Sequence, residues 1–108
     1  MLEEPELHVL VSRDVVDQDR KSVGYVECFF NDRNTGKPEW IGVLTGKLRH
    51  RHVLVPVAGA EKVNGSLRVP WTKEQVEAAP DYGEPERDIP EELEREAYRH
   101  YGLEPSAA

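Results

Sequence analysis

Residues 63–80, VNGSLRVPWTKEQVEAAP, specify three consecutive local structures and constrain the fold more than any other stretch of the chain. The pair Asn64-Gly65 favours a two-residue hairpin turn, because both central positions of that turn need a positive φ angle. Thr72, with Gln75 three residues later, forms a capping box that begins a helix. Pro80 ends this helix, because proline keeps the preceding residue out of the helical conformation. The sequence therefore predicts a β-hairpin that leads into a short capping helix.

The first two-thirds of the chain are typical of short strands separated by turns. Residues 23–30, VGYVECFF, are rich in β-branched and aromatic side chains, and residues 38–46 and 53–57 are further apolar runs. Large apolar groups fall on both faces of residues 23–30, so this strand either bends at a bulge near Gly24 or has both faces covered. Six short strands at close spacing, with no helix between them, predict a mainly β protein that closes into a small six-stranded barrel.

The C-terminal third predicts a linker followed by a second helix. Residues 81–89 are rich in Pro, Gly and charge and have no periodicity. The helix expected over residues 90–102 has Pro90 at its start and Gly102 after its last turn. Its narrow apolar side should dock on its own barrel or on another subunit, through Leu93, Ala97, Tyr98 and Tyr101. The predicted organisation is a barrel with its capping helix over 1–80, a linker over 81–89, a helix over 90–102 and a tail over 103–108.

The charges divide the chain into two parts. Up to Lys73, ten residues are acidic and eleven basic, a net charge of +1, whereas from Glu74 onward eleven are acidic and three basic, a net charge of −8. Together they give the net charge of −7. Nucleic-acid affinity depends mainly on Lys and Arg side chains that neutralise phosphates. The acidic balance therefore argues against nucleic acid as a partner.

Cysteine usage and hydropathy indicate the compartment. Cys28 is the single cysteine, so no internal disulfide can form, which fits a reducing environment. The first ten residues, MLEEPELHVL, have neither the basic region nor the apolar run of a secretory signal. No stretch approaches the roughly 20 apolar residues of a membrane-spanning helix. We therefore expect a cytoplasmic protein without a membrane span.

The most distinctive candidate site is the basic run KLRHRH, residues 47–52. His50 and His52 would point to the same side of a strand, but a structural metal site needs further ligands that the sequence does not place nearby. The run is interpreted as a solvated loop or as a docking patch for an acidic partner, such as the C-terminal helix of a neighbouring copy. The residues of this predicted patch are Lys47, Arg49, His50, Arg51 and His52.

Other candidate residues have structural interpretations. Cys28 has apolar neighbours and is interpreted as a small buried hydrophobe. An apolar strip made by Tyr25, Phe29, Phe30 and Trp40 would mark a partner or dimer surface wherever it is exposed. The sequence contains no nucleophile elbow, P-loop or dinucleotide fingerprint. We therefore expect no enzyme activity, no cofactor and no metal.

Three segments together resemble the PRC-barrel domain: VGYVECFFNDRNTGKPEWIGV, then VLVPVAGAEKVNGSLRVPWTKEQVEAAP, then YRHYGL. This fold is shared by the cytoplasmic part of the photosynthetic reaction-centre H subunit and by the C-terminal domain of the ribosome maturation factor RimM. The resemblance covers roughly residues 12–103. Its specific parts, RVPWTKEQVEAAP and HYGL, are similar to small stand-alone bacterial members described as H-subunit-like or stress-associated.

The resemblance implies a compact six-stranded barrel that self-associates, works by contacting other proteins and has no catalytic residues. The chain departs from both relatives, since we identify neither the membrane helix of the H subunit nor the extra N-terminal barrel of RimM, and Asn31 stands where an apolar residue is usual. The predicted function is a non-enzymatic protein-interaction or scaffold module, acting as a homodimer. The alternatives are a ribosome- or RNA-associated accessory factor and a reaction-centre H-like accessory protein.

Overall fold

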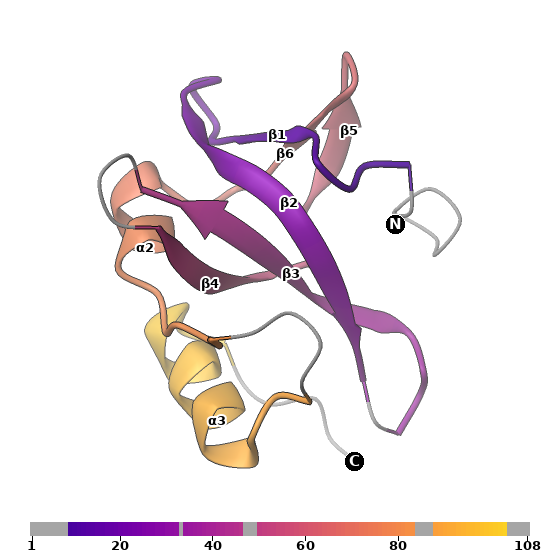
Figure 1. Cartoon of the computed structure of the whole chain (residues 1–108), viewed down its shortest axis with the longest axis vertical. Helices are drawn as coiled ribbons and strands as arrows, with labels where there is room; N and C mark the ends of the chain where they lie inside the picture. The colour runs from indigo at the N-terminus through magenta and orange to yellow at the C-terminus, as the bar shows by residue number, and fades with distance from the viewer. Residues whose placement is uncertain (1–8, 33, 47–49, 84–87, 104–108) are drawn as a thin grey trace.

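The computed structural model describes residues 9–32, 34–46, 50–83 and 88–103, and within them six strands and two helices (Figure 1). The strands form one sheet in the order β4-β3-β2-β1-β6-β5, in which β1 and β6 are parallel and all other neighbours antiparallel. The elements are β1 (Asp14–Val16), β2 (Ser22–Asn31), β3 (Pro38–Thr45), β4 (Arg51–Pro56), β5 (Glu61–Val63), β6 (Ser66–Arg68), α2 (Lys73–Glu77) and α3 (Glu91–His100). The mainly β class is therefore confirmed.

The local signals of residues 63–80 form the predicted structures. Asn64 and Gly65 both have positive φ, at 49° and 81°, and join β5 to β6 as a hairpin. Thr72 caps α2, because its hydroxyl accepts from the backbone N–H of Gln75 while the side chain of Gln75 accepts from the N–H of Thr72. Val76 is fully buried, and α2 packs against β4 and β2. The hairpin and the capping helix are thus confirmed.

The sheet is not closed, which corrects the expected closed barrel. β4 and β5 are the two edges of the strand order, and β5 has only three residues. The edge of β4 pairs instead with the segment after α2, through a bridge between Val53 and Asp81 and a hydrogen bond from the N–H of Tyr82 to the carbonyl oxygen of His52 (2.7 Å). The stretch predicted as a linker over 81–89 therefore begins with residues that cover a sheet edge, as exposed strand edges require.

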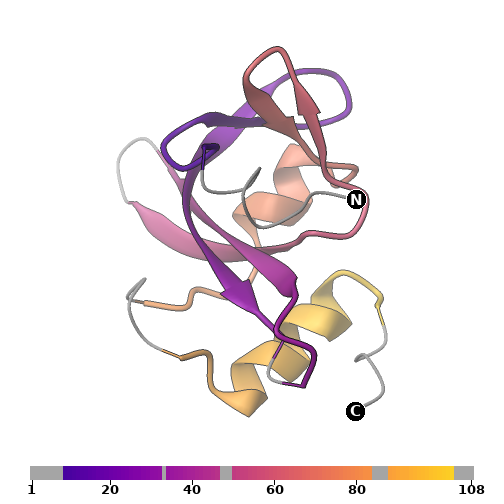
Figure 2. The ribbon, with the colours of Figure 1, turned by 90° about the vertical axis from the view of Figure 1, so that its right-hand side faces the viewer.

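Most of both faces of the central strands is covered. On the inner face, Val26, Val43 and Val53 are register partners with at most 2% exposure, and they form part of the core. The pairing of β2 has three register shifts: one beside Gly24, as predicted, one at Glu27, and one between Phe30 and Asn31. The outer face of β2–β4 carries residues 80–83 and α3, which lies on the side of the sheet away from β5 and β6 (Figures 1 and 2). The C-terminal segment therefore forms a second layer.

α3 packs against the sheet of its own chain through aromatic side chains. Tyr98 meets Trp40 edge-on, with ring centroids 4.9 Å apart, and the hydroxyl of Tyr101 donates to the carbonyl oxygen of Leu54 at 2.7 Å. Of the residues predicted to dock this helix or to mediate self-association, Ala97, Tyr98 and Tyr101 are buried and Leu93 is half-buried. Neither described helix is long and apolar enough to cross a membrane.

Candidate functional site

The candidate site is a row of three residues across the outer face of the sheet, which we call the Tyr25 row. Tyr25 of β2 is the register partner of Leu44 of β3, and Leu44 is the register partner of His52 of β4. On its other side Tyr25 is the register partner of Asp14 of β1, which is half-buried. Register partners on neighbouring strands project their side chains to the same face. The ring of Tyr25 is 58% exposed, and Leu44 and His52 are half-buried. The row is therefore an accessible strip with an aromatic and an aliphatic group.

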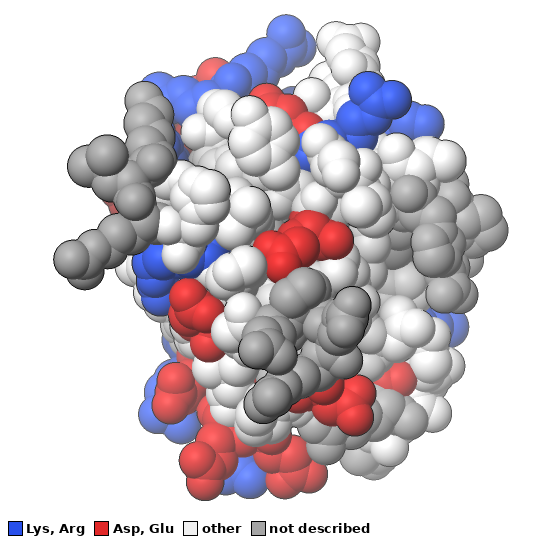
Figure 3. Space-filling view, viewed as in Figure 1, with Lys and Arg blue, Asp and Glu red and all other residues white. Residues whose placement is uncertain are grey.

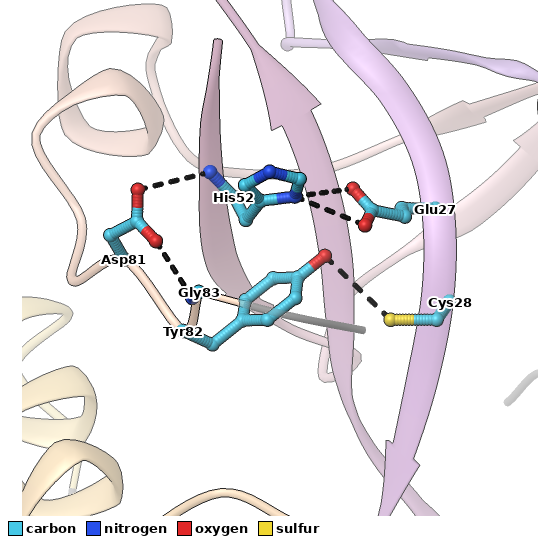
Figure 4. Close-up of polar contacts among 6 residues, drawn as sticks. All are labelled: Glu27, Cys28, His52, Asp81, Tyr82 and Gly83. Carbon is cyan, nitrogen blue, oxygen red and sulfur yellow. Dashed lines mark hydrogen bonds and ion pairs between the residues drawn. The ribbon is translucent and has the colours of Figure 1, made fainter. Parts of the chain in front are cut away.

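A hydrogen-bonded pair of a histidine and a glutamate lies beside this strip. The Nδ1 atom of His52 donates to the carboxylate of Glu27, at 2.8 Å from one oxygen and 3.0 Å from the other (Figure 4). The side chains are 31% and 17% exposed, so the pair is partly shielded from solvent. Glu27 reaches this position because the register shift in β2 falls there. The bulge therefore directs a carboxylate toward the imidazole, as bulges commonly re-aim side chains.

The strip ends at the neighbouring row of register partners, Cys28, Gly42 and Leu54, which residues 80–83 cover. Tyr82 packs over Gly42, a position where a Cβ would stand only 2.6 Å from the tyrosine oxygen. The thiol of Cys28 donates to this oxygen at 3.7 Å, and the ring of His52 packs against the tyrosine ring (Figure 4). Burial raises the pKa of both the Tyr82 hydroxyl and the Cys28 thiol, so both groups stay protonated near neutral pH. Cys28 and Tyr82 therefore hold residues 80–83 against the sheet and do not form a nucleophile.

Asp81 also holds residues 80–83 in place. Its carboxylate accepts from the backbone N–H of His52 at 3.2 Å and from that of Gly83 at 2.7 Å (Figure 4). One side chain thus binds the edge of β4 and the turn at Gly83, which has a φ of 83°. The boundary between the covered and accessible parts of the outer face is therefore set by hydrogen bonds.

The predicted basic patch is only partly described by the structure. Lys47 and Arg49 lie outside the described residues, and His50 is exposed. The guanidinium of Arg51 donates to the carbonyl oxygens of Glu77 and Ala79 (2.8 Å for the latter), at the C-terminal end of α2. Since His52 is paired with Glu27, two of the three patch residues that the structure describes have partners within the chain. Their role as a docking patch stays a prediction.

The expected apolar strip is exposed at one end only. Tyr25 is exposed, Phe29 and Phe30 are half-buried, and Trp40 is 2% exposed beneath α3. The exposed large apolar side chains among the described residues are Tyr25, Val9 and Val11. The segment that carries the two valines continues into residues hydrogen-bonded to Val26 of β2. Exposed apolar groups therefore occur on β2 and in the segment beside it. The sequence indicates Tyr25 as a candidate surface residue but gives no such indication for Leu44, because only the strand register shows that the two are neighbours.

The surface charges follow the division seen in the sequence. Asp and Glu side chains are most numerous over the lower part of the molecule, where α3 lies, with some Lys and Arg among them, and further Lys and Arg side chains stand at the upper end (Figure 3). On α3 the exposed charged residues are Glu91, Glu92, Arg95, Glu96 and Arg99. The acidic end and the Tyr25 row are therefore different parts of the surface.

Metal and small-molecule sites find little support in the described residues. Within these ranges no three His, Cys, Asp or Glu side chains lie together as metal ligands would. A surface pocket of about 160 Å³ lies between the β1–β2 turn and β6, lined by Gln18, Gly59, Glu61, Arg68, Val69 and Pro70. Typical ligand pockets measure roughly 300–1,000 Å³. This pocket is therefore small for an organic ligand.

Comparison with known proteins places this geometry in context. The family model described as the PRC-barrel domain matches residues 3–76. Among solved structures, a putative 16S ribosomal RNA processing protein RimM from Pseudomonas aeruginosa is similar, with 24% identity and a TM-score of 0.48. That alignment covers 62% of this chain and 43% of the RimM chain, so it spans less than half of that protein. No curated protein matches.

Proposed function

This chain belongs to the PRC-barrel family, and we propose that it is a non-enzymatic module that binds another protein through the Tyr25 row. The observation that carries the proposal is the exposure of Tyr25, at 58%, next to Leu44 on a face that is otherwise covered by residues 80–83 and α3. Tyrosine is enriched among residues that dominate binding energy at protein interfaces. A strip of this kind on rigid strands is suited to a protein partner.

The filled interior favours binding of a partner at the surface over binding of a small ligand inside the fold. Val15, Ile41, Val43 and Leu67 are among the core side chains with no exposure. Protein interiors are close-packed, and these side chains fill the interior of the fold. The partner is therefore expected to meet the outside of the sheet, and the module needs no activated nucleophile to act.

The net charge of −7 favours a protein over nucleic acid as the partner. Nucleic acids bind mainly through neutralisation of their phosphates by Lys and Arg. The cytoplasmic location and the homodimer predicted from the sequence are retained as parts of this proposal. The mass of the full-length protein across a concentration series, measured by light scattering, tests the homodimer.

Quantitative affinity purification from an extract of the source cells tests the proposal. The wild type is compared with Tyr25→Ala and with Lys62→Ala, a matched control on exposed β5. We expect a partner that is enriched with the wild type and the control and reduced about tenfold or more with Tyr25→Ala, the size of an interface hot spot. Equal recovery with all three proteins, each shown to be folded by circular dichroism, would contradict the proposal.

A further inference from the structure

The β1–β2 turn and the β5–β6 hairpin both lie at the end of the molecule away from α3 (Figures 1 and 2). The surface pocket of about 160 Å³ is lined by residues of both. Its volume is below that of a typical ligand pocket, but a water molecule needs only about 10–15 Å³ of such space. The pocket therefore has room for a molecule of a few heavy atoms.

Two opposite charges line this pocket without pairing with each other. Glu61 of β5 and Arg68 of β6 are register partners, and opposite charges directly across a strand pair commonly attract each other. Among the described residues, however, the carboxylate of Glu61 has no hydrogen-bond or ion-pair partner. The guanidinium of Arg68 donates there only to the carbonyl oxygen of Gln18, at 3.3 Å. The pocket thus keeps a carboxylate and most of a guanidinium available to an occupant.

Contacts within the chain hold the walls of the pocket in place. Nε2 of Gln18 donates to the carbonyl oxygen of Pro70 at 2.9 Å, which joins the β1–β2 turn to the segment after β6. Gly59 approaches Pro70 so closely that a Cβ would stand 2.9 Å from Cγ of the proline. The backbone N–H of Val69 donates to the carbonyl oxygen of Val16 at 2.9 Å. A site that is ordered before binding pays less entropy when it binds, so these contacts favour recognition of a small molecule.

We propose that this pocket binds a free α-amino acid with a small side chain. A lone anion would be repelled by the carboxylate of Glu61, and a lone cation would be repelled by the guanidinium of Arg68. A zwitterion satisfies both groups, because its carboxylate accepts from the forked donors of Arg68 while its ammonium group donates to Glu61. Pro70 adds an apolar contact for a group the size of a methyl. Charge and size therefore both select a small zwitterion.

Two-dimensional NMR of the isotopically labelled full-length protein tests this site, with L-alanine as the probe. Propanoate and ethylamine are the matched controls, since they are alanine without its ammonium and without its carboxylate. At constant ionic strength, L-alanine should cause saturable shifts confined to the backbone amides of the pocket, Gln18, Gly59, Glu61, Arg68 and Val69. Each control should bind about tenfold more weakly or less, because it makes one charge-assisted contact instead of two. Shifts that rise without saturation, or equal binding of a control, would overturn the proposal.

Substitutions at the two charges test their separate contributions. Glu61→Gln removes a carboxylate that has no partner among the described residues, so it should weaken binding of L-alanine about tenfold while the rest of the spectrum stays unchanged. Arg68→Gln should weaken binding by a similar factor. Lys62→Gln, on the same exposed strand but outside the pocket, is the control and should bind as the wild type does. Unchanged affinity in either pocket variant would overturn the proposal. It would leave the proposed function standing, because Tyr25 does not line this pocket.

Discussion

Tyr82 lies over Gly42 so closely that a Cβ at position 42 would stand 2.6 Å from the tyrosine oxygen and 2.9 Å from Cζ. The missing side chain lets residues 80–83 approach the outer face of the sheet and pair with the edge of β4. This cover ends at His52, so Tyr25 and Leu44 beyond it stay accessible. The absence of a side chain at Gly42 thus allows residues 80–83 to cover one part of the outer face and leaves the part at Tyr25 available to a partner.

Substitution of Gly42 tests this packing. Gly42→Ala should lower the free energy of unfolding by about 1–3 kcal/mol, because the new methyl group overlaps Tyr82 and Cys28. The measurement is urea denaturation followed by circular dichroism. The tyrosine oxygen accounts for part of the overlap and Sγ of Cys28, at 2.5 Å, for another part, so Tyr82→Phe should reduce the cost of Gly42→Ala without removing it. Additive effects in this double-mutant cycle would show that the two residues do not compete for the same space.

Two tyrosines of the α3 interface should respond differently to removal of their hydroxyl groups. Tyr101→Phe should lower the free energy of unfolding by about 1–3 kcal/mol, because the buried carbonyl of Leu54 loses its donor. Tyr98→Phe should leave the stability unchanged or raise it, since its hydroxyl has no partner among the described residues. Urea midpoints of the two variants and the wild type provide the comparison. Equal losses in both variants would contradict the hydrogen-bond assignment.

The buried tyrosines also predict a loss of stability in alkali. Burial raises the pKa values of Tyr82 and Tyr101 above the ordinary value of 10.0. Below about pH 10 these hydroxyls are protonated in the folded and unfolded chains alike, so they add no pH dependence. At higher pH the unfolded chain loses protons that the folded chain keeps, and the free energy of unfolding must fall.

Urea midpoints measured from about pH 8 to about pH 11 check this sign. The decline should be smaller in Tyr82→Phe, which removes one of the buried groups. Tyr25→Phe changes an exposed ring and should decline as the wild type does. A wild-type midpoint that does not fall above pH 10 would show that the two hydroxyls ionise as readily in the folded chain as in the unfolded one.

Arg51 is expected to stabilise the fold rather than to bind a partner protein. Arg51→Ala should lower the free energy of unfolding by about 1–3 kcal/mol, because the carbonyl oxygens of Glu77 and Ala79 lose a charged donor. Arg51→Lys should recover only part of the loss, since an ammonium cannot reproduce the forked geometry of a guanidinium. Thermal unfolding measures both variants, with His50→Ala at an exposed position as the control. No difference between Arg51→Ala and the control would favour the solvated loop inferred from sequence.

The parts of the fold that the sequence predicts are those encoded by neighbouring residues. The turn at Asn64-Gly65 and the capping box of Thr72 and Gln75 depend on contacts within four residues, and both are present. Asp17 makes local contacts of the same kind, because its carboxylate accepts from the backbone N–H groups of Asp19 and Lys21. Local chemistry therefore determines these features independently of the rest of the chain.

The site and the closure of the sheet depend on contacts between distant residues. Leu44 belongs to the candidate site only because the ladder places it between Tyr25 and His52. The edge of β4 is covered by its pairing with Asp81, in a stretch whose composition is typical of a linker. The sequence predicts that Arg51 belongs to a solvated loop or a docking patch, but its hydrogen-bond partners lie 26 and 28 residues away. Periodicity carries no information about such pairings.

Crosslinking at position 25 tests the central claim most directly. A photoreactive phenylalanine analogue replaces Tyr25 in the full-length protein, and a second protein carries it at Lys62, on the exposed edge strand β5. On irradiation in cells, the account predicts discrete protein adducts at position 25 that are absent or much weaker at position 62. The same adduct pattern at both positions, or adducts at position 62 alone, would contradict the claim that the Tyr25 row is the surface through which this protein acts.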